Sequence, residues 1–211
     1  REDGSFAWWK GMDGSPCMTM SVVQTLVRLN KLIGVQKATS NMVEAGFAYM
    51  DKRMAEEVND IKKAEAKGMK MRPSELAVQY MYSVSIADRK LSASAKRNFD
   101  FLVNRLSEKN TEFTIYGKAV SALVLAKNGY ADKAADLLES IRQYTVYKEE
   151  MGRYFDTPKA LYSWFDYRIP SQVAAIEALQ TLQPSDRQTI SEMQRWLLQE
   201  KRTQAWDTPI N

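Results

Sequence analysis

The sequence contains no histidine and only one cysteine, Cys17. Without histidine, the chain cannot assemble a Ser-His-Asp or Cys-His catalytic arrangement from its own residues. The same shortage excludes the His/Cys ligand sets of ordinary zinc sites, and a single cysteine cannot form an intrachain disulfide. We therefore expect no metal, no other cofactor and no enzymatic activity from these 211 residues.

Long apolar runs are also missing. The longest apolar stretch, residues 119–126, is far shorter than the roughly 20 residues that cross a bilayer, so we expect no membrane insertion by this segment. The net charge is only +4, and the basic side chains are interspersed with acidic ones. Because no basic stripe is interleaved with stacking aromatics, we expect no binding to nucleic acid.

Two local features have alternative interpretations. The densest basic stretch, residues 62–72, is interpreted as a solvated helix end, where cations are favourable, and contact with an acidic partner is the alternative. Cys17 is interpreted as a small buried apolar residue at the mouth of the inner helix layer, and a thiol activated by a helix N-terminus is the alternative. Gly46 and Gly117 lie inside expected helices, which indicates close helix packing at both positions.

Hydrophobic residues make up 45% of the chain and charged residues 27%, which is typical of a folded globular protein. Start and stop signals combine with apolar periodicity to predict helices throughout. Ser15-Pro16 and Gly34, for example, are the start and stop signals of the first helix. The eight expected helices cover residues 16–33, 39–67, 73–84, 92–109, 112–129, 131–147, 170–182 and 185–202.

The expected helices alternate in polarity. A helix that is apolar on nearly all sides is surrounded by protein, whereas a helix with one apolar stripe lies on the outside. We therefore assign the odd-numbered helices to an inner layer and expect them to be markedly more buried than the even-numbered ones. The inner helices start near residues 16, 73, 112 and 170, with a further start signal at 209, so the separations are 57, 39, 58 and 39 residues.

Aromatic segments precede three of these starts: Phe6-Ala7-Trp8-Trp9, residues 162–167, and Trp206. The alternating long and short separations and the recurring aromatics indicate an internal repeat of helical hairpins, which would form a solenoid or a closed ring. The aromatics favour the ring, since its funnel-shaped end would bury them. We predict an all-α fold: a single, partial α/α-toroid domain over residues 1–211, an incomplete ring because the chain is a fragment. Residues 5–9 and 152–156 would pair as a small β-ribbon.

The segment Asp3-Gly4-Ser5-Phe6, followed by Gly14-Ser15 and a threonine-containing apolar helix, resembles the thioester domain of α2-macroglobulin-family proteins, in particular the large bacterial members. The closing segment Gln204-Ala205-Trp206-Asp207-Thr208-Pro209 is similar to a helix start late in that domain. The resemblance covers the later two-thirds of the domain. It implies an α/α toroid of nested hairpins in a periplasmic or envelope-associated bacterial protein that traps peptidases.

This chain departs from the family pattern in one respect. The family's thioester motif is Cys-Gly-Glu-Gln, whereas Cys17 is followed by Met18-Thr19-Met20. In the family that motif lies before the Asp-Gly-Ser loop, and therefore upstream of residue 1. The resemblance then implies a non-catalytic domain that contributes to endopeptidase inhibition through conformational change and through contact with neighbouring domains of the same chain and with target peptidases.

In a ring of hairpins, all loops that lead into inner helices lie at one end. We expect a contact face there, partly apolar and rimmed by carboxylates, formed by Trp8, Trp9, Asp13, Trp164, Asp166, Trp206 and Asp207. The alternative is that the aromatics only fill the funnel-shaped end of the ring and that the aspartates cap helices and turns. Carboxylates beside aromatic platforms also occur in glycoside hydrolases, so a fragment of an α/α-toroid carbohydrate-active enzyme is the second hypothesis.

Overall fold

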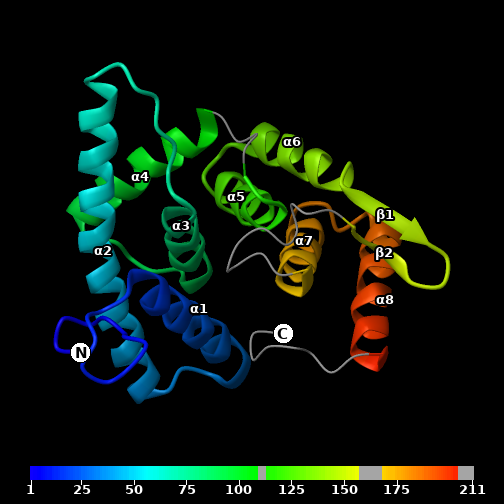
Figure 1. The fold of residues 1–211 in the computed structure, drawn as a ribbon, viewed down its shortest axis with the longest axis horizontal. Coiled ribbons are helices and arrows are strands. Elements are labelled where there is room, and N and C mark those ends of the chain that lie inside the picture. The colour runs from blue at the N-terminus through cyan, green and yellow to red at the C-terminus, as the bar shows by residue number, and fades with distance from the viewer. Residues whose placement is uncertain (109–112, 157–167, 204–211) are drawn as a thin grey trace. The chain divides into compact units, whose positions relative to one another are not determined.

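The computed structural model describes residues 1–108, 113–156 and 168–203. Within these ranges the chain forms eight helices and one two-stranded ribbon, so the predicted all-α class is confirmed. Contacts divide the chain into two compact units, Arg1–Lys109 and Asn110–Asn211 (Figure 1). Each unit has a core of its own.

The first unit contains α1 (Pro16–Ile33), α2 (Lys37–Glu65), α3 (Glu75–Ala87) and α4 (Ala93–Glu108). Helix α1 packs against both α2 and α3, and α4 packs against α2 and, less extensively, α3. Large side chains that these helices turn toward one another fill the core; they include Met20, Val23, Phe47, Met50, Tyr80, Met81, Leu102 and Leu106.

The second unit contains α5 (Ile115–Lys127), α6 (Ala131–Arg142), β1 (Thr145–Lys148), β2 (Gly152–Phe155), α7 (Arg168–Leu182) and α8 (Arg187–Thr203). Helix α5 packs against α6 and α7, and α8 packs against α7 and β2. The two strands pair antiparallel, with Thr145 opposite Phe155 and Lys148 opposite Gly152. The core of this unit includes Ile115, Ala119, Leu125, Leu138, Ile141, Phe155, Leu179, Met193 and Trp196.

Two details of the expected secondary structure are wrong. The sixth helix was expected to reach residue 147, but it ends at Arg142, and Thr145–Lys148 form β1, since β-branched and aromatic residues favour strands. The ribbon pairs β1 with β2, and residues 5–9 form no strand. Gly152 allows β2 to lie against α8, because it adopts φ +91° and a Cβ there would lie 2.3 Å from the carbonyl oxygen of Glu192.

The predicted alternation of burial holds for three of the four odd-numbered helices. Eight of 13 residues are buried in α3, nine of 13 in α5 and seven of 15 in α7, against five of 16 in α4 and four of 12 in α6. Helix α1 contradicts the prediction, because only four of its 18 residues are buried. Its later apolar side chains, Leu29, Leu32 and Ile33, are exposed, since α2 and α3 cover only part of its surface.

Close helix packing is confirmed at Gly46 but not at Gly117. A Cβ on Gly46 of α2 would lie 2.4 Å from the Cγ2 methyl of Val23 on α1, which is fully buried. At Gly117 the nearest atoms belong to Phe113 and Thr114, directly before its own helix, at 3.2 Å. The absence of a side chain at Gly46 therefore lets α1 and α2 approach each other.

Substituting Gly46→Ala is expected to destabilise the protein by about 1 kcal/mol, because overpacking costs about 1–3 kcal/mol and exceeds the helix-propensity gain of alanine. Urea denaturation followed by circular dichroism measures the change. In a Val23→Ala background the same substitution should be neutral or stabilising, because the blocking methyl groups are gone. Stabilisation by Gly46→Ala in the otherwise unchanged protein would contradict the close packing.

Candidate functional site

The candidate site is the loop of residues 6–14, which precedes α1. The two ends of this loop are joined at the first turn of the helix. Ser15 donates its backbone N–H to the Phe6 carbonyl at 2.8 Å, and Phe6 donates its own N–H to Thr19 Oγ1 at 2.9 Å. The Thr19 hydroxyl in turn donates to the Ser15 carbonyl at 2.7 Å, and Thr19 is fully buried. The base of the loop is therefore tied to α1.

Helix α2 holds the same segment from a second side. Gly4, with φ +83°, lies so close to α2 that a Cβ would be 2.2 Å from the Ala45 carbonyl oxygen. The Tyr49 hydroxyl donates to the Gly14 carbonyl at 3.4 Å. Burial raises the pKa of the Tyr49 phenol, so this group stays protonated and remains a donor at neutral pH. Contacts with both helices thus fix where the loop leaves the unit.

Asp3 has a positioning role in this segment. One carboxylate oxygen, Oδ1, accepts the Ser5 hydroxyl at 2.6 Å and the Ser5 backbone N–H at 3.0 Å. These two hydrogen bonds lower the pKa of Asp3, because both favour its charged form. Ser5 itself is fully buried. This carboxylate therefore holds the turn that leads into the loop.

The loop presents two tryptophans to solvent. Trp8 is 40% exposed and Trp9 is 69% exposed, and their ring centroids lie 6.4 Å apart with an angle of 33° between the planes. The expectation that these aromatics are buried is therefore wrong for both of them. Met12, in the same loop, is 47% exposed. The result is an apolar tip on a segment whose base is held by hydrogen bonds.

Asp13 lies beside this tip with its side chain fully in solvent. The nearest cation is the Arg1 guanidinium, at 4.0 Å, and Arg1 also donates to the Met12 carbonyl. Asp13 does not cap α1; the cap is Ser15, whose Oγ accepts the Met18 N–H at 3.3 Å. The Asp13 carboxylate is therefore available at the rim of the exposed loop.

Three of the seven predicted site residues thus lie together on one loop: Trp8, Trp9 and Asp13. The other four, Trp164, Asp166, Trp206 and Asp207, lie outside the described residues. Their convergence on one end of a ring stays a prediction. Cys17, one residue past the proline that starts α1, is a half-buried free thiol.

Sequence reasoning missed an ionic cluster inside the first unit. Arg89 donates from both terminal nitrogens to Asp51, at 2.8 and 3.0 Å, and its guanidinium lies 4.7 Å from the ring centre of Phe47. The Tyr80 hydroxyl donates to the same Asp51 carboxylate at 2.6 Å. Burial, followed by this bond to Asp51, raises the pKa of Tyr80 well above its usual value. The cluster thus joins Asp51 of α2 to Tyr80 of α3 and to Arg89, which lies two residues past the end of α3.

A groove of about 360 Å³ runs between α2 and the connection that leads to α3. Its apolar floor includes Met54 and Ile61, and its lining includes both cations and carboxylates. Glu57, in this lining, accepts both the backbone N–H and the hydroxyl of Ser74, at 2.7 and 2.8 Å. Glu57 thus joins one side of the groove to Ser74, whose Oγ accepts the Ala77 N–H and caps α3.

The described ranges contain no group of three or more His, Cys, Asp or Glu side chains arranged to hold a metal ion. In the same ranges, none of the helices combines the length and the apolar character needed to cross a membrane.

Comparison with protein-family models finds no match to this chain, and comparison with curated proteins finds none either.

Proposed function

We propose that this chain is a non-catalytic α/α-toroid domain of a bacterial α2-macroglobulin-like protein. In this role it contributes to endopeptidase trapping through conformational change and through contact with neighbouring domains. The parent protein would be periplasmic or associated with the cell envelope. The proposal rests on the loop and helix-start motifs that resemble the family's thioester domain, together with two features of the molecule.

The neighbour relations of the helices support nested hairpins. In the first unit α1 contacts α2, its hairpin partner, and also α3, the next odd-numbered helix. In the second unit α5 contacts α6 and α7 in the same way, and α7 contacts α8. Contact between successive odd-numbered helices is what an inner layer requires. The high burial of α3, α5 and α7 agrees with that arrangement.

The observation that carries the functional part is the exposed pair Trp8 and Trp9. Large aromatics are the side chains that most often dominate the energy of protein–protein contacts. Here Trp9 lies largely in solvent and Trp8 is 40% exposed, on a loop whose base is hydrogen-bonded to α1 and α2. A loop held in this way loses little conformational entropy when a partner covers it. A neighbouring domain of the same long chain would therefore find an apolar anchor there, rimmed by Asp13.

The double substitution Trp8→Ala with Trp9→Ala tests this contact in the full-length protein that contains the segment. We expect the equilibrium constant for docking of the neighbouring domain on this loop to fall by about 30-fold or more, because a hot-spot tryptophan contributes about 2 kcal/mol or more. Hydrogen exchange of residues 6–14 measures the contact, and inhibition of an endopeptidase acting on a large substrate measures trapping. Tyr147→Ala, an exposed aromatic at 46%, is the control and should change neither. Unchanged exchange and inhibition in the tryptophan variant would refute the proposed face.

Binding or cleavage of carbohydrate is the second candidate function. The observation in its favour is the exposed tryptophan pair with the Asp13 carboxylate in the same loop. Glycoside hydrolysis needs a pair of carboxylates, and of the two aspartates in this segment Asp3 is engaged by Ser5 and Asp13 lies 4.0 Å from the Arg1 guanidinium. We therefore expect no hydrolysis when the purified chain is incubated with polysaccharides. Release of reducing sugar that disappears with Asp13→Asn would favour this candidate over the first.

A further inference from the structure

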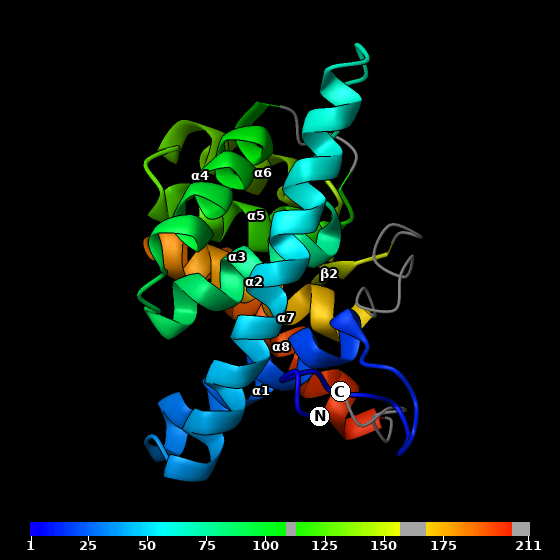
Figure 2. The same ribbon diagram turned by 90° about the vertical axis from the view of Figure 1, so that its left-hand side faces the viewer.

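The end of α2 and the turn that follows it form a second surface feature, here called the basic tip: residues 62–72. Five of these eleven residues are basic: Lys62, Lys63, Lys67, Lys70 and Arg72. All five are exposed, and so is every residue from 66 to 72. Figure 2 shows the last turns of α2 extending past the other helices of the first unit. The sequence alone favoured a solvated helix end at this position.

The tip has a defined backbone. Helix α2 ends at Glu65, and the chain reverses at Gly68, whose φ is +79°. The backbone N–H of Met69 donates to the Ala64 carbonyl at 3.0 Å, which closes the turn. On the return side, Pro73 is buried and Ser74 is bound to Glu57. Both ends of the tip are therefore anchored to the unit.

Two of the five cations of the tip have no counter-charge bound to them in the described part of the chain. Its one carboxylate, Glu65, accepts hydrogen bonds from Arg105, which lower the pKa of Glu65. Lys63 lies 3.5 Å from Asp60. In the described part of the chain, the ammonium groups of Lys67 and Lys70 take part in no ion pair or hydrogen bond. Lys67 and Lys70 therefore present unpaired positive charge to solvent.

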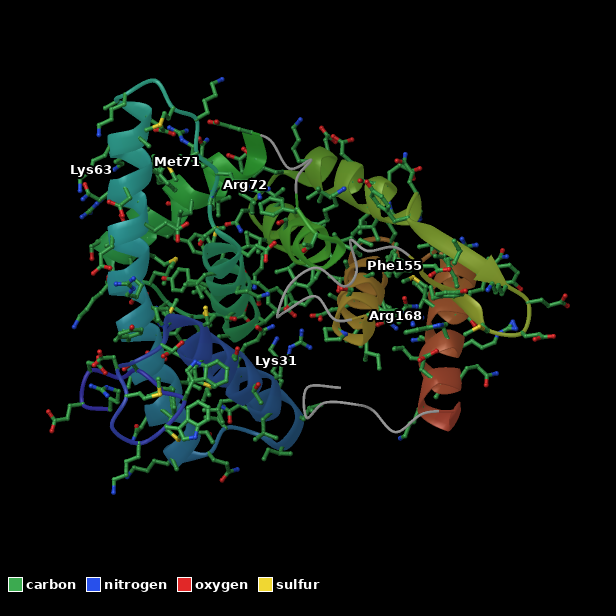
Figure 3. All side chains as sticks on the ribbon, in the orientation of Figure 1. Lys31, Lys63, Met71, Arg72, Phe155 and Arg168 are labelled. Carbon is green, nitrogen blue, oxygen red and sulfur yellow. The ribbon has the colours of Figure 1, made fainter. Side chains whose placement is uncertain are left out.

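Two methionines lie among these cations. Met69 is 53% exposed and Met71 is 47% exposed, and they alternate with Lys70 and Arg72 along the turn. Figure 3 shows Met71 and Arg72 on the connection that follows α2, and Lys63 on the helix itself. Methionine is flexible and apolar, so it adapts to an irregular apolar boundary. The tip thus combines exposed basic side chains and exposed apolar side chains in one short segment.

We propose that the basic tip binds the surface of a bilayer that contains anionic phospholipid, with lysines at the phosphates and Met69 and Met71 in the interfacial layer. Four of the five cations are lysines, which act as flexible point charges and suit a fluid layer of headgroups. Recognition of an acidic protein relies more on the planar, bidentate guanidinium of arginine. Burial of the two methionine side chains in the interfacial layer of a bilayer would add a favourable apolar contribution to binding. The inference does not depend on the function proposed above.

Sedimentation of the 211-residue chain with lipid vesicles tests the proposal. We expect binding to vesicles in which about a third of the phosphatidylcholine is replaced by phosphatidylglycerol, and none to pure phosphatidylcholine. Substituting Lys67→Gln with Lys70→Gln should weaken partitioning about 30-fold, since each lysine near such a surface contributes about fivefold. The matched control is Lys37→Gln with Lys52→Gln, which removes the same charge from exposed positions elsewhere on α2.

Each outcome of this experiment supports or contradicts membrane binding by the basic tip. Loss of binding in the tip variant with retention in the control supports the proposal, provided that circular dichroism shows both variants folded. Met69→Ser with Met71→Ser should also weaken binding, most clearly in high salt, where the charge contribution is screened. Equal loss in both lysine variants would overturn the proposal, because net charge alone would then explain binding. Binding of soluble polyglutamate at the tip without binding to vesicles would overturn it in favour of an acidic protein partner.

Discussion

Substituting Trp196→Ala is expected to lower the free energy of unfolding by about 4 kcal/mol, the range found for large-to-small changes in a core. Trp196 of α8 is only 1% exposed and stacks on Tyr154 of β2, with ring centroids 5.8 Å apart and planes 12° from parallel. The Arg168 guanidinium lies 5.2 Å from the centre of the same indole ring. Alanine leaves a cavity and removes the surface on which both neighbours lie.

Urea denaturation followed by circular dichroism measures the decrease in the free energy of unfolding, and hydrogen exchange shows which elements are destabilised. The faster exchange should appear in β2, α7 and α8, because these elements meet around the indole. Trp196→Phe should cost much less, since it keeps an aromatic ring and removes an indole N–H that has no acceptor within the described residues.

The matched control for this substitution is Trp9→Ala. It makes the same chemical change at a side chain that is 69% exposed, and it should alter stability by less than about 0.5 kcal/mol. Comparable losses at Trp196 and Trp9 would contradict the assignment of Trp196 to the core. They would also contradict the exposure of Trp9, on which the proposed contact face depends.

Local chemistry explains why helix boundaries could be predicted from the sequence. Helix α1 begins at Pro16 and ends at Ile33, as expected, because Ser15 caps its start and Gly34 adopts φ +84° after its end. These signals lie within a few residues of the boundary that they determine. Ser74 and Thr114 cap α3 and α5 in the same way, close to the expected starts.

Contacts between distant segments explain where the predictions failed. The apolar spacing of Leu137, Leu138, Ile141 and Tyr144 favours a helix that continues past residue 142, yet β1 begins at Thr145. The alternative becomes favourable because β2 packs on α8, and only Gly152 permits its close approach to Glu192. No periodicity within residues 131–147 carries information about a helix some 40 residues further on.

The candidate site was predicted in part for the same reason. An aromatic loop before Ser15-Pro16 is visible in the sequence, and the loop is where it was expected. The outward direction of Trp8 and Trp9 depends on what the rest of the unit leaves uncovered, and α1 and α2 hold only the base of the loop. Likewise, nothing local links Asp51 to Arg89, which lie 38 positions apart.

Substituting Asp51→Ala is expected to lower the free energy of unfolding by about 3 kcal/mol, because breaking a largely buried ion pair removes the main counter-charge of Arg89. The side chains of Arg89 and Asp51 are 13% and 21% exposed. Burial disfavours the charged form of Arg89, but the hydrogen bonds and charge of Asp51 outweigh that cost and raise the pKa of Arg89. Without Asp51, Arg89 keeps the Phe47 ring and, as its one carboxylate partner among the described residues, Glu44 at 3.6 Å, and Tyr80 loses the acceptor of its hydroxyl.

Urea denaturation at neutral pH measures this loss, and Asp100→Ala is the matched control. Asp100 pairs with Lys96 on the exposed face of α4, where both side chains are more than half exposed, so its loss should cost less than about 0.5 kcal/mol. Replacing both partners, as Asp51→Leu with Arg89→Met, should recover much of the stability, because no buried charge is then left alone. Equal effects of Asp51→Ala and Asp100→Ala would show that the cluster contributes no more than a surface pair.

The same cluster predicts a loss of stability at alkaline pH. The pKa of Tyr80 is raised in the folded protein by burial and by its bond to Asp51, from an ordinary value of 10.0. A raised pKa means that the folded state holds the phenolic proton more tightly than the unfolded chain does. The resulting stabilisation is therefore complete below about pH 10 and declines as the pH rises further. Tyr80→Phe should flatten this decline, and an unchanged decline in that variant would place its cause outside the cluster.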